Sequence, residues 1–458
     1  MARLARLARL CLTVLLCLAF VATGCTKRPQ APAVTAFPPM GWNSWNSGVA
    51  LTQANIHAVI DALVSSGMRA AGYRYVTLDA GWAAPERTEG HLTADPRRFP
   101  DGMAALADYA HGRGLLLGLY DSPYGELCSG QPALAAIGHE SQDARDFAAW
   151  GVDFVKYDWC HTDAEHGLQM RVFAAMRDAL RASGRHIVYS INPNSSSDVD
   201  AGARYDWSSI ADMTRATGDL VPVWRKTGPK WGPLDPFAWR IFQGVPDEFA
   251  MAAKSLTQTR AGYGNDADML VTGVQWSDWV KKDLRSFRTA LTYGLAPELV
   301  RQFTTMSDDE LLKTLTTVPN LTTEEQRTHM SLWAMLSAPL IAGNDVRNMD
   351  QTTRDLLTNR DVLAVDQDPM FARFARVPGR PGVLSKPLSG GAVAVALYNS
   401  TDQPATLGTT AAAIGMPAAR CYAVRDLWAQ SSSISTGDIG GHTVAPHATT
   451  LLRVSRCP

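Results

Sequence analysis

Carboxylates close several short apolar runs in this chain of 458 residues. Two carboxyl groups facing each other across a sugar ring can hydrolyse a glycosidic bond, with one of them supplying the proton to the leaving oxygen. Acidic residues that recur at such positions therefore indicate carboxylate chemistry. The candidates are Asp79, Asp121, Asp158, Asp219, Asp266, Asp268 and Asp345.

Asp158 is the strongest candidate for a nucleophile. It lies in the run 151–160, in which Lys156 and Asp158 alternate onto the same side of an extended chain. A nearby ammonium favours the ionised carboxyl group and keeps it nucleophilic at neutral pH. A purely structural ion pair is the alternative interpretation of the same two residues.

Other common chemistries lack their motifs in the sequence. It contains no G-x-S-x-G, H-E-x-x-H, Walker or C-x-x-C pattern. Cys160, His161 and His166 lie close together, but their spacing fits no standard zinc site. We therefore predict neither a metal nor a cofactor.

The elements that must position these carboxylates alternate between strand and helix. We expect helices at 53–66, 102–113, 140–149 and 169–183, and strands at 40–45, 73–79, 115–121, 152–158, 186–192, 214–220, 268–271 and 339–344. Eight such repeats predict an α/β fold, a closed (β/α)₈ TIM barrel over 37–370, whose active face lies at the carboxyl ends of the strands. A doubly wound sheet is less favoured because G-x-G-x-x-G is absent.

The sequence pattern changes after about residue 370. Segments 382–386, 392–399 and 447–454 alternate or are β-branched, between Gly, Ser and Thr turns. This pattern predicts an antiparallel β-sandwich domain over 371–458. Cys421 and Cys457 are the only cysteines of that domain, so we expect them to pair.

The N-terminal 25 residues predict export. Three arginines precede a short apolar stretch, as in a signal peptide, and the stretch is too short to span a membrane. It ends in Val-Ala-Thr-Gly-Cys at 21–25, which resembles a bacterial lipobox and implies lipidation of Cys25; ordinary cleavage nearby is the alternative. Residues 26–36 read as a linker. We expect a lipoprotein facing the periplasm or cell exterior, or otherwise a secreted protein.

The charge of the chain limits its partners. Lys and Arg total 43 against 44 for Asp and Glu, a net charge of −1, which excludes the broad basic field that nucleic acids require. Membrane attachment would then depend on the N-terminal lipid. A neutral carbohydrate substrate is compatible with this balance, and the sequence makes no prediction of oligomeric state.

Several motifs occur together in a specific order. They are PMGWNSWN at 39–46, KYDWC at 156–160, RATGD at 215–219, NDADML at 265–270, SAPLIAGND at 337–345 and VRDLW at 424–428. The set resembles glycoside hydrolase family 27, the α-galactosidase or melibiase family, over about residues 37–458. The resemblance implies a retaining glycosidase without a metal.

The resemblance also implies roles for individual residues. Asp158 corresponds to the nucleophile, and Asp219 to the proton donor that later acts as a base; a retaining mechanism needs these carboxyl groups about 5–5.5 Å apart. Cys128 and Cys160 correspond to a family disulfide beside the nucleophile. The expected substrate-binding residues are Trp45, Asp79, Tyr120, Lys156, Asn192, Arg215 and Asp268.

The chain departs from the family pattern at three places. Ala80 replaces a sugar-binding carboxylate, and a second family disulfide is absent. The segment 191–194, which includes Asn192, replaces the usual C-E-W loop near the sugar's C2; an amide can still donate to and accept from a hydroxyl. About 40 residues at 280–319 look inserted, where they could form a subsite, a lid or only extra structure.

We therefore predict an exo-glycosidase that removes terminal α-D-galactose with retention. Another family activity, β-L-arabinopyranosidase or isomaltodextranase, is the first alternative because Ala80 and Asn192 change the groups that read the sugar. A glycan-binding lipoprotein without catalysis is the second. The presence of both Asp158 and Asp219 disfavours it.

Overall fold

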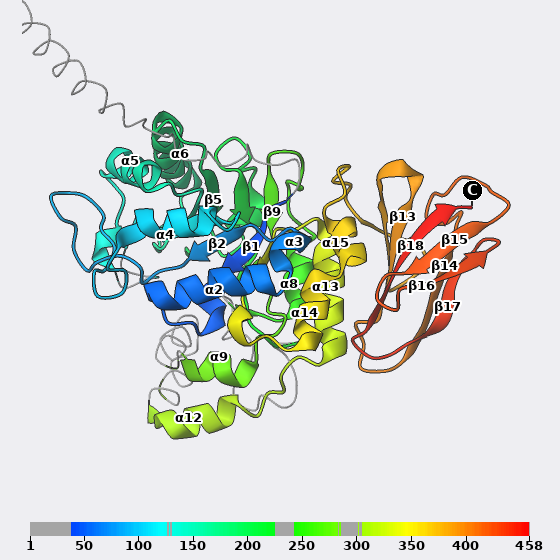
Figure 1. Cartoon of the computed structure of the whole chain (residues 1–458). Helices are drawn as coiled ribbons and strands as arrows, with labels where there is room; N and C mark the ends of the chain where they lie inside the picture. Colours follow the sequence, from blue (N-terminus) through cyan, green and yellow to red (C-terminus); the bar gives the residue numbers. More distant parts are fainter. Residues whose placement is uncertain are drawn as a thin grey trace, which may run out of the picture. The chain divides into compact units, whose positions relative to one another are not determined.

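The computed structural model describes residues 38–125, 128, 131–224, 242–282, 284, 301 and 305–457 (Figure 1). The predicted signal peptide, Cys25 and the linker lie outside these residues. Among the helices that the structure describes, none combines the length and apolar character needed to cross a bilayer.

Eight parallel strands form the first sheet, in the order β10-β1-β2-β3-β4-β5-β6-β9. Hydrogen bonds between Leu270 and the backbone of Ile341 and Gly343 bring the chain after β9 back to β10, so the sheet closes on itself. The predicted TIM barrel is therefore confirmed. Its strands are β1 (Met40–Asn43), β2 (Tyr75–Leu78), β3 (Leu116–Asp121), β4 (Phe154–Asp158), β5 (Val188–Asn192), β6 (Met213–Arg215), β9 (Gly264–Asp266) and β10 (Leu340–Ala342).

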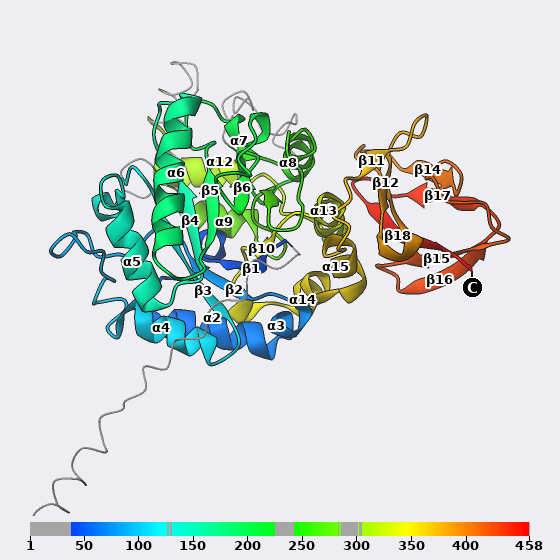
Figure 2. The ribbon, with the colours of Figure 1, turned by 90° about the horizontal axis from the view of Figure 1, so that it is seen from above.

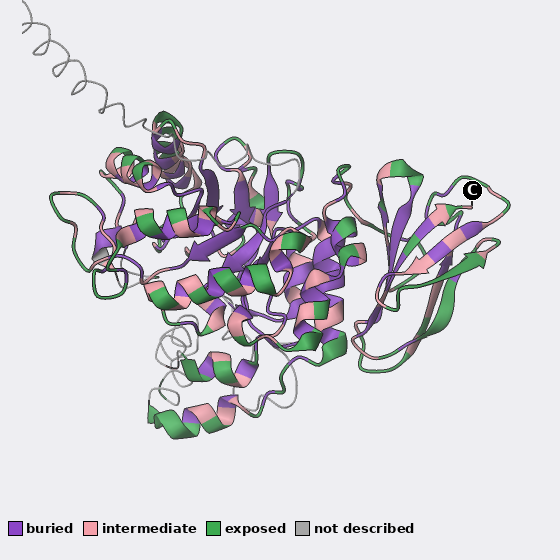
Figure 3. Ribbon diagram, in the orientation of Figure 1, coloured by how far each residue is buried: buried purple, intermediate pink, exposed green. Residues whose placement is uncertain are grey.

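Amphipathic helices surround the barrel, as the view from above shows (Figure 2). In α2 (Gln53–Ser65), Ile56, Val59, Ile60 and Leu63 form the buried face, and the side chain of Thr52 caps the amino end. Figure 3 shows the same division, with buried strands and helices exposed on their outer faces. The other helices are α3 (Met68–Ala71), α4 (Gly102–His111), α5 (Glu140–Trp150), α6 (His166–Ala182), α7 (Ala201–Arg204), α8 (Val245–Ala252), α13 (Thr323–Leu336), α14 (Gln351–Thr358) and α15 (Arg360–Asp366).

Two of the predicted strands differ from the structure. The expected strand 214–220 is divided into β6 and a short β7 (Asp219–Leu220), which pairs with β8 (Phe242–Gln243) instead of with the barrel. The strand expected at 268–271 is wrong: β9 ends at Asp266, and Asp268 has a φ of 72°, outside extended backbone. The apolar run Met269–Val271 misled the prediction because β9 itself, Gly-Asn-Asp, is polar.

The C-terminal domain contains a six-stranded sheet and a separate pair of strands, all antiparallel as predicted. Val395, Leu397, Ile439 and Val444 belong to the apolar core of this domain. Its strands are β11 (Ala375–Arg376), β12 (Val383–Pro387), β13 (Val393–Tyr398), β14 (Ala405–Thr410), β15 (Tyr422–Asp426), β16 (Ser431–Ser435), β17 (Asp438–Val444) and β18 (Thr449–Arg456). The expected disulfide Cys421–Cys457 joins the start of β15 to the end of β18.

A buried lysine connects this domain with the barrel. Lys386 of β12 is fully buried, and its Nζ donates to the carbonyls of Ala334 (2.7 Å) and Val365 (2.9 Å) and to the hydroxyl of Ser337 (2.6 Å). These acceptors lie at the carboxyl ends of α13 and α15, where a positive charge interacts favourably with the helix dipole; the Ala334 carbonyl also accepts the backbone N–H of Ser337 at 3.3 Å.

Candidate active site

Asp158, Lys156 and Asp79 meet where β4 and β2 end. The Nζ of Lys156 lies 2.8 Å from Oδ2 of Asp79 and 3.5 Å from Oδ2 of Asp158. The expected alternation in β4 therefore places both side chains on one face, together with a residue from another strand. Charges on both carboxylates raise the pKa of Lys156 despite its burial, so it stays an ammonium.

The carboxyl group of Asp158 is buried and incompletely satisfied. Its Oδ1 is inaccessible to solvent and accepts no hydrogen bond from the described residues. Burial raises the pKa of Asp158 to about 6, against which the charge of Lys156 acts. A tenth of the Asp158 side chain is exposed, so the carboxyl group is largely desolvated but still reaches the surface of the site. An ionised carboxylate in such a position can act as a nucleophile.

Asp219 lies in a different environment, held by a buried guanidinium. The Nη2 of Arg215 lies 3.0 Å from Oδ1 of Asp219 and 2.6 Å from Oδ2 of Asp268, and it also donates to the carbonyl of Gly218. Half of the Asp219 side chain, 53%, is exposed, whereas Asp268 and Arg215 are buried. The carboxyl group of Asp219 is thus fixed on one side and open to solvent on the other, as an acid that exchanges protons with water requires.

Asp268 holds the chain that carries Asp219. Its Oδ2 accepts a hydrogen bond from the backbone N–H of Leu220 at 2.7 Å, and its Oδ1 accepts one from Met269 at 2.6 Å. The left-handed backbone at Asp268, with φ 72°, is uncommon outside glycine and concentrates at functional sites. Burial raises the pKa of Asp268, and the nearby charge of Arg215 opposes this shift.

Trp45 lies on the loop after β1 and connects with the same network. Its backbone N–H donates to Oδ1 of Asn43 at 2.8 Å, while Nδ2 of Asn43 donates to Oδ2 of Asp79 at 3.0 Å. Trp45 itself is half-buried, so part of its ring remains available. A continuous set of polar contacts therefore runs from Trp45 to Lys156.

Tyr120, the second predicted aromatic residue of the site, is almost completely buried. Only 1% of the residue is exposed, and its ring lies 5.3 Å from Nζ of Lys156, where it supports the ammonium by a cation–π contact. Its hydroxyl lies 3.2 Å from Sγ of Cys160. The structure contains the expected disulfide Cys128–Cys160, two residues after Asp158. Tyr120 thus contacts Lys156 and Cys160, and its role in binding the sugar stays a prediction.

Asn192 ends β5 directly beside Asp158 in the sheet register. It is buried, and its Oδ1 accepts the backbone N–H of Asn194 at 3.1 Å. The amide oxygen therefore shapes the turn, which leaves Nδ2 as the polar group that Asn192 can offer to a ligand. Ala80, at the end of β2, is half-buried and presents no polar side chain.

Three of the candidate carboxylates serve other purposes. Asp345 is paired with Arg347 at 2.8 Å and caps a short helix. Asp121 is fully buried, with its Oδ1 on the backbone N–H of Ser122 at 2.9 Å. Asp266 accepts the backbone N–H of Asp268 at 2.9 Å and so supports a site residue without being one.

Sequence reasoning missed two polar side chains of the site. Asn43, inside a motif that we used only for recognition, holds both Asp79 and Trp45. Glu248 of α8 is fully buried, and burial raises its pKa well above the usual range, against the opposing charge of Arg215. It occupies the buried face of α8 with Val245, Phe249 and Ala252, a helical spacing that could have revealed a buried acid.

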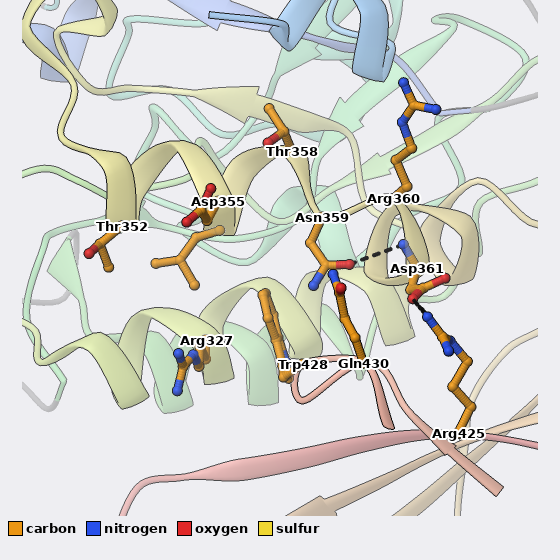
Figure 4. A pocket seen from close by; sticks show the side chains of 11 residues that line it. Arg327, Thr352, Asp355, Thr358, Asn359, Arg360, Asp361, Arg425, Trp428 and Gln430 are labelled. Carbon is orange, nitrogen blue, oxygen red and sulfur yellow. Dashed lines mark hydrogen bonds and ion pairs between the residues drawn. The ribbon is translucent and has the colours of Figure 1, made fainter. Parts of the chain in front are cut away.

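One cavity of the structure lies away from the carboxylate network. A cavity of about 550 Å³ opens between α14, α15 and the chain around β15, and its walls include Asp355, Arg360 and Trp428 (Figure 4). None of its lining residues belongs to the carboxylate network. Two of its charged residues, Arg425 and Asp361, form an ion pair with each other at 2.6 Å. The paired charges, and not the size of a cavity, identify the candidate site.

No metal site competes with this interpretation in the described part of the chain, where no three His, Cys, Asp or Glu side chains gather to hold an ion. Cys160 is in a disulfide, and the rings of His161 and His166 pack on Tyr124 and Tyr205. The site therefore offers carboxylates, a lysine, an arginine and an aromatic ring at the carboxyl end of a barrel. This combination defines a glycoside hydrolase.

Comparisons with known proteins identify its family. The profile described as "Alpha galactosidase A" matches residues 37–281 and 309–368, and the "Alpha galactosidase C-terminal beta sandwich domain" matches 378–454. The chain is 34% identical over 373 residues to alpha-galactosidase A of Cellvibrio japonicus, covering 80% of this chain and 76% of that protein. It is 33% identical over 408 residues to the alpha-galactosidase of Cyamopsis tetragonoloba, covering 88% and 82%.

Solved structures agree with this assignment. Alpha-galactosidase I of Mortierella vinacea is 28% identical, with a TM-score of 0.72 over 93% of this chain and 98% of that chain. A family 27 β-L-arabinopyranosidase of Geobacillus stearothermophilus shares the fold at 23% identity, with a TM-score of 0.68 over 92% and 98%. The chain belongs to the α-galactosidase family, glycoside hydrolase family 27. Residues 282–308, unmatched by the profile, fall within the predicted insertion.

Proposed function

We propose that this glycoside hydrolase removes terminal α-D-galactosyl residues from oligo- or polysaccharides by double displacement. The observation that carries the proposal is the contrast between two carboxyl groups near enough for the charge of Asp219 to act on Asp158. Asp158 is buried with Oδ1 free of hydrogen bonds, whereas Asp219 is exposed and bound to Arg215. Different environments suit the two carboxyl groups to different roles.

In the first step, the carboxylate of Asp158 attacks the anomeric carbon as the glycosidic bond breaks, and Asp219 gives its proton to the departing oxygen. In the second, Asp219 takes a proton from water, the water oxygen attacks the anomeric carbon, and the bond to Asp158 breaks. Lys156 and Asp79 are suited to binding ring hydroxyls because their charged groups lie together, 2.8 Å apart, one as a donor and the other as an acceptor. Trp45 offers an aromatic face to the C–H side of the sugar.

A substrate panel tests this proposal. p-Nitrophenyl α-D-galactoside should be hydrolysed faster than the β-L-arabinopyranoside, and dextran should yield no product. NMR should show the α-anomer of galactose first, because two displacements restore the configuration. Absence of galactose release by the wild-type enzyme, or a first product of the β-anomer, would exclude the proposed reaction.

β-L-Arabinopyranosidase activity is the second candidate, and one observation favours it. The β-L-arabinopyranoside ring has the configuration of an α-D-galactoside without the C6 hydroxymethyl group. Ala80, beside Asp79, has no polar side chain for such a group. A higher kcat/KM for the arabinopyranoside than for the galactoside would establish this candidate in place of the first.

We also propose that the enzyme is exported and anchored through a lipid on Cys25. The support is the n-region, apolar stretch and Val-Ala-Thr-Gly-Cys ending at residue 25. Mass spectrometry of the mature N-terminal peptide should find acylated Cys25, and Cys25→Ser should release the enzyme from membranes. An unmodified N-terminus at another residue would contradict the anchor but leave export intact.

A further inference from the structure

Two helices cover one end of the barrel, apart from those that surround it. They are α9 (Trp276–Lys282) and α12 (Asp308–Leu315), which lie side by side in Figure 1. A capping box between Ser307 and Glu310 begins α12. The family profile stops at residue 281 and resumes at 309, so the junction between these helices is a feature of this chain.

These helices share a small hydrophobic core with the chain that follows Asp219. We call this core the α9–α12 cluster; it is separate from the barrel core and consists of Val221, Val223, Phe242, Trp276, Val280, Leu311, Leu315 and Val318. Val221 is only two residues beyond Asp219. The cluster therefore packs directly against the segment that carries the proposed acid.

The helix α9 also contacts the loop after β1 that carries Trp45. The Nε1 of Trp279 donates to Oδ1 of Asn46 at 2.8 Å. The Nζ of Lys282 donates to the backbone carbonyl of Trp45 and lies 5.7 Å from the centre of its ring. These two contacts come from one helix and fix consecutive residues of the loop.

Trp279 is itself held firmly. Its ring stacks on that of Trp276, with centroids 5.5 Å apart and 16° between the planes, and meets Phe242 edge-on at 5.7 Å. Asn46 is buried, so losing its partner would leave an amide oxygen unsatisfied. The loop that presents Trp45 consequently depends on the position of α9.

We propose that Trp279 and Lys282 are positioning residues that hold Trp45 in its substrate-binding orientation. This inference rests on the proposed function, in which Trp45 packs against the sugar. The helix α9 then contributes to affinity by supporting Trp45 from the side away from the sugar. The acid Asp219 and the ring of Trp45 are fixed to one common element, the α9–α12 cluster with its flanking polar contacts.

Two neighbouring lysines provide a matched test. Lys282→Met removes the donor to the Trp45 carbonyl, whereas Lys281→Met removes an equal charge that pairs with Asp278 at 3.7 Å on the same helix. Both lysines are exposed, so both variants should fold. Losing one hydrogen bond, worth about 0.5–1.5 kcal/mol, should raise KM for p-nitrophenyl α-galactoside about two- to tenfold in Lys282→Met, with kcat within twofold. Lys281→Met should match the wild type.

Two tryptophans of α9 give a second, independent pair. Trp279→Phe loses the bond to Asn46, and Trp276→Phe loses a bond of equal length, 2.8 Å, to the carbonyl of Leu315 inside the cluster. Both should lower the melting temperature, but only Trp279→Phe should raise KM. A rise in KM shared by both variants of either pair would overturn the inference, because general destabilisation of α9 would then explain it. The absence of a rise in both variants would overturn it too, because the contacts with the Trp45 loop would then not affect binding.

The wild-type control separates this inference from the proposed function. If the wild type releases no galactose, the proposed function fails whatever the variants do. If the wild type is active and the KM values of Lys282→Met and Trp279→Phe stay within 1.5-fold of it, about the precision of a KM comparison, only the positioning role fails.

Discussion

The ammonium of Lys156 lies 3.5 Å from Oδ2 of Asp158, close enough for an ion pair but without a hydrogen bond. Burial outweighs this attraction, and the pKa of Asp158 rises to about 6. Because the nucleophile must be ionised, kcat/KM should fall as the pH drops below about 6, with the slope expected for protonation of a single group. Assays on p-nitrophenyl α-galactoside across pH 4–8 will measure this acidic limb of the pH profile; kcat/KM is the quantity to plot because it reports the pKa values of the free enzyme.

Lys156→Met should move that limb toward higher pH. Removing a positive charge that lowers the pKa of Asp158 raises this pKa further. Lys254→Met, which removes an exposed lysine just beyond α8, is the control and should leave the limb in place. A limb that stays near pH 6 in Lys156→Met would show that another group controls it.

Asp158→Asn should abolish turnover yet stabilise the fold at neutral pH. The folded pKa of about 6 lies above the ordinary value of 3.8, so the folded state binds protons more tightly and its stability falls as pH rises through this window. Asparagine mimics the protonated acid and removes this cost, which is at most about 3 kcal/mol. Denaturant unfolding should show the gain at pH 7 and none at pH 3.5; equal stability of variant and wild type at pH 7 would contradict the raised pKa.

The two disulfides should contribute similarly to the stability of the fold but differently to the activity. They close segments of similar length, with separations of 32 and 36 residues, and each is worth about 3–4 kcal/mol in the chain-entropy model. Replacing Cys128 and Cys160 by serine should also lower kcat/KM, because Cys160 contacts the Tyr120 hydroxyl beneath Lys156. The matching change at Cys421 and Cys457 should spare it, as kinetics on refolded protein at 20 °C will show.

Asp153 should control stability without affecting catalysis. It precedes β4 at the amino end of the barrel, is fully buried, pairs with Arg185, and accepts from Nε2 of His111 at 2.7 Å. Asp153→Ala should cost about 3–5 kcal/mol in urea unfolding, because it removes the fully buried carboxylate that both the Arg185 guanidinium and the His111 ring contact. Asp61→Ala, which breaks the exposed pair with Arg113, should cost about 1 kcal/mol or less. A large rise in KM for Asp153→Ala would contradict this separation.

Local sequence predicted those elements in which an apolar run and a polar end coincide. β3, β4 and β5 end at Asp121, Asp158 and Asn192, the residues at which the predicted strands end. β9 was missed because its three residues are polar and its place is fixed by neighbouring strands, a cause that the local pattern does not contain.

The site divides in the same way. The contact of Lys156 with Asp158 follows from strand periodicity, but its shorter contact, with Asp79, joins residues 77 positions apart and depends on the barrel closing in register. Tyr120 shows the limit of inference from residue types, because its type does not reveal that only 1% of it is exposed or that its ring lies 5.3 Å from the ammonium of Lys156.

The buried ammonium of Lys386 makes the C-terminal domain a condition for a complete barrel. Its three acceptors belong to the ends of α13 and α15, and all three would lose this donor at once if the chain ended near residue 370. Separation of the two domains would therefore break three buried, charge-assisted hydrogen bonds together. We therefore expect cooperative melting of barrel and sandwich in one transition, and inactivity of a chain truncated before β12.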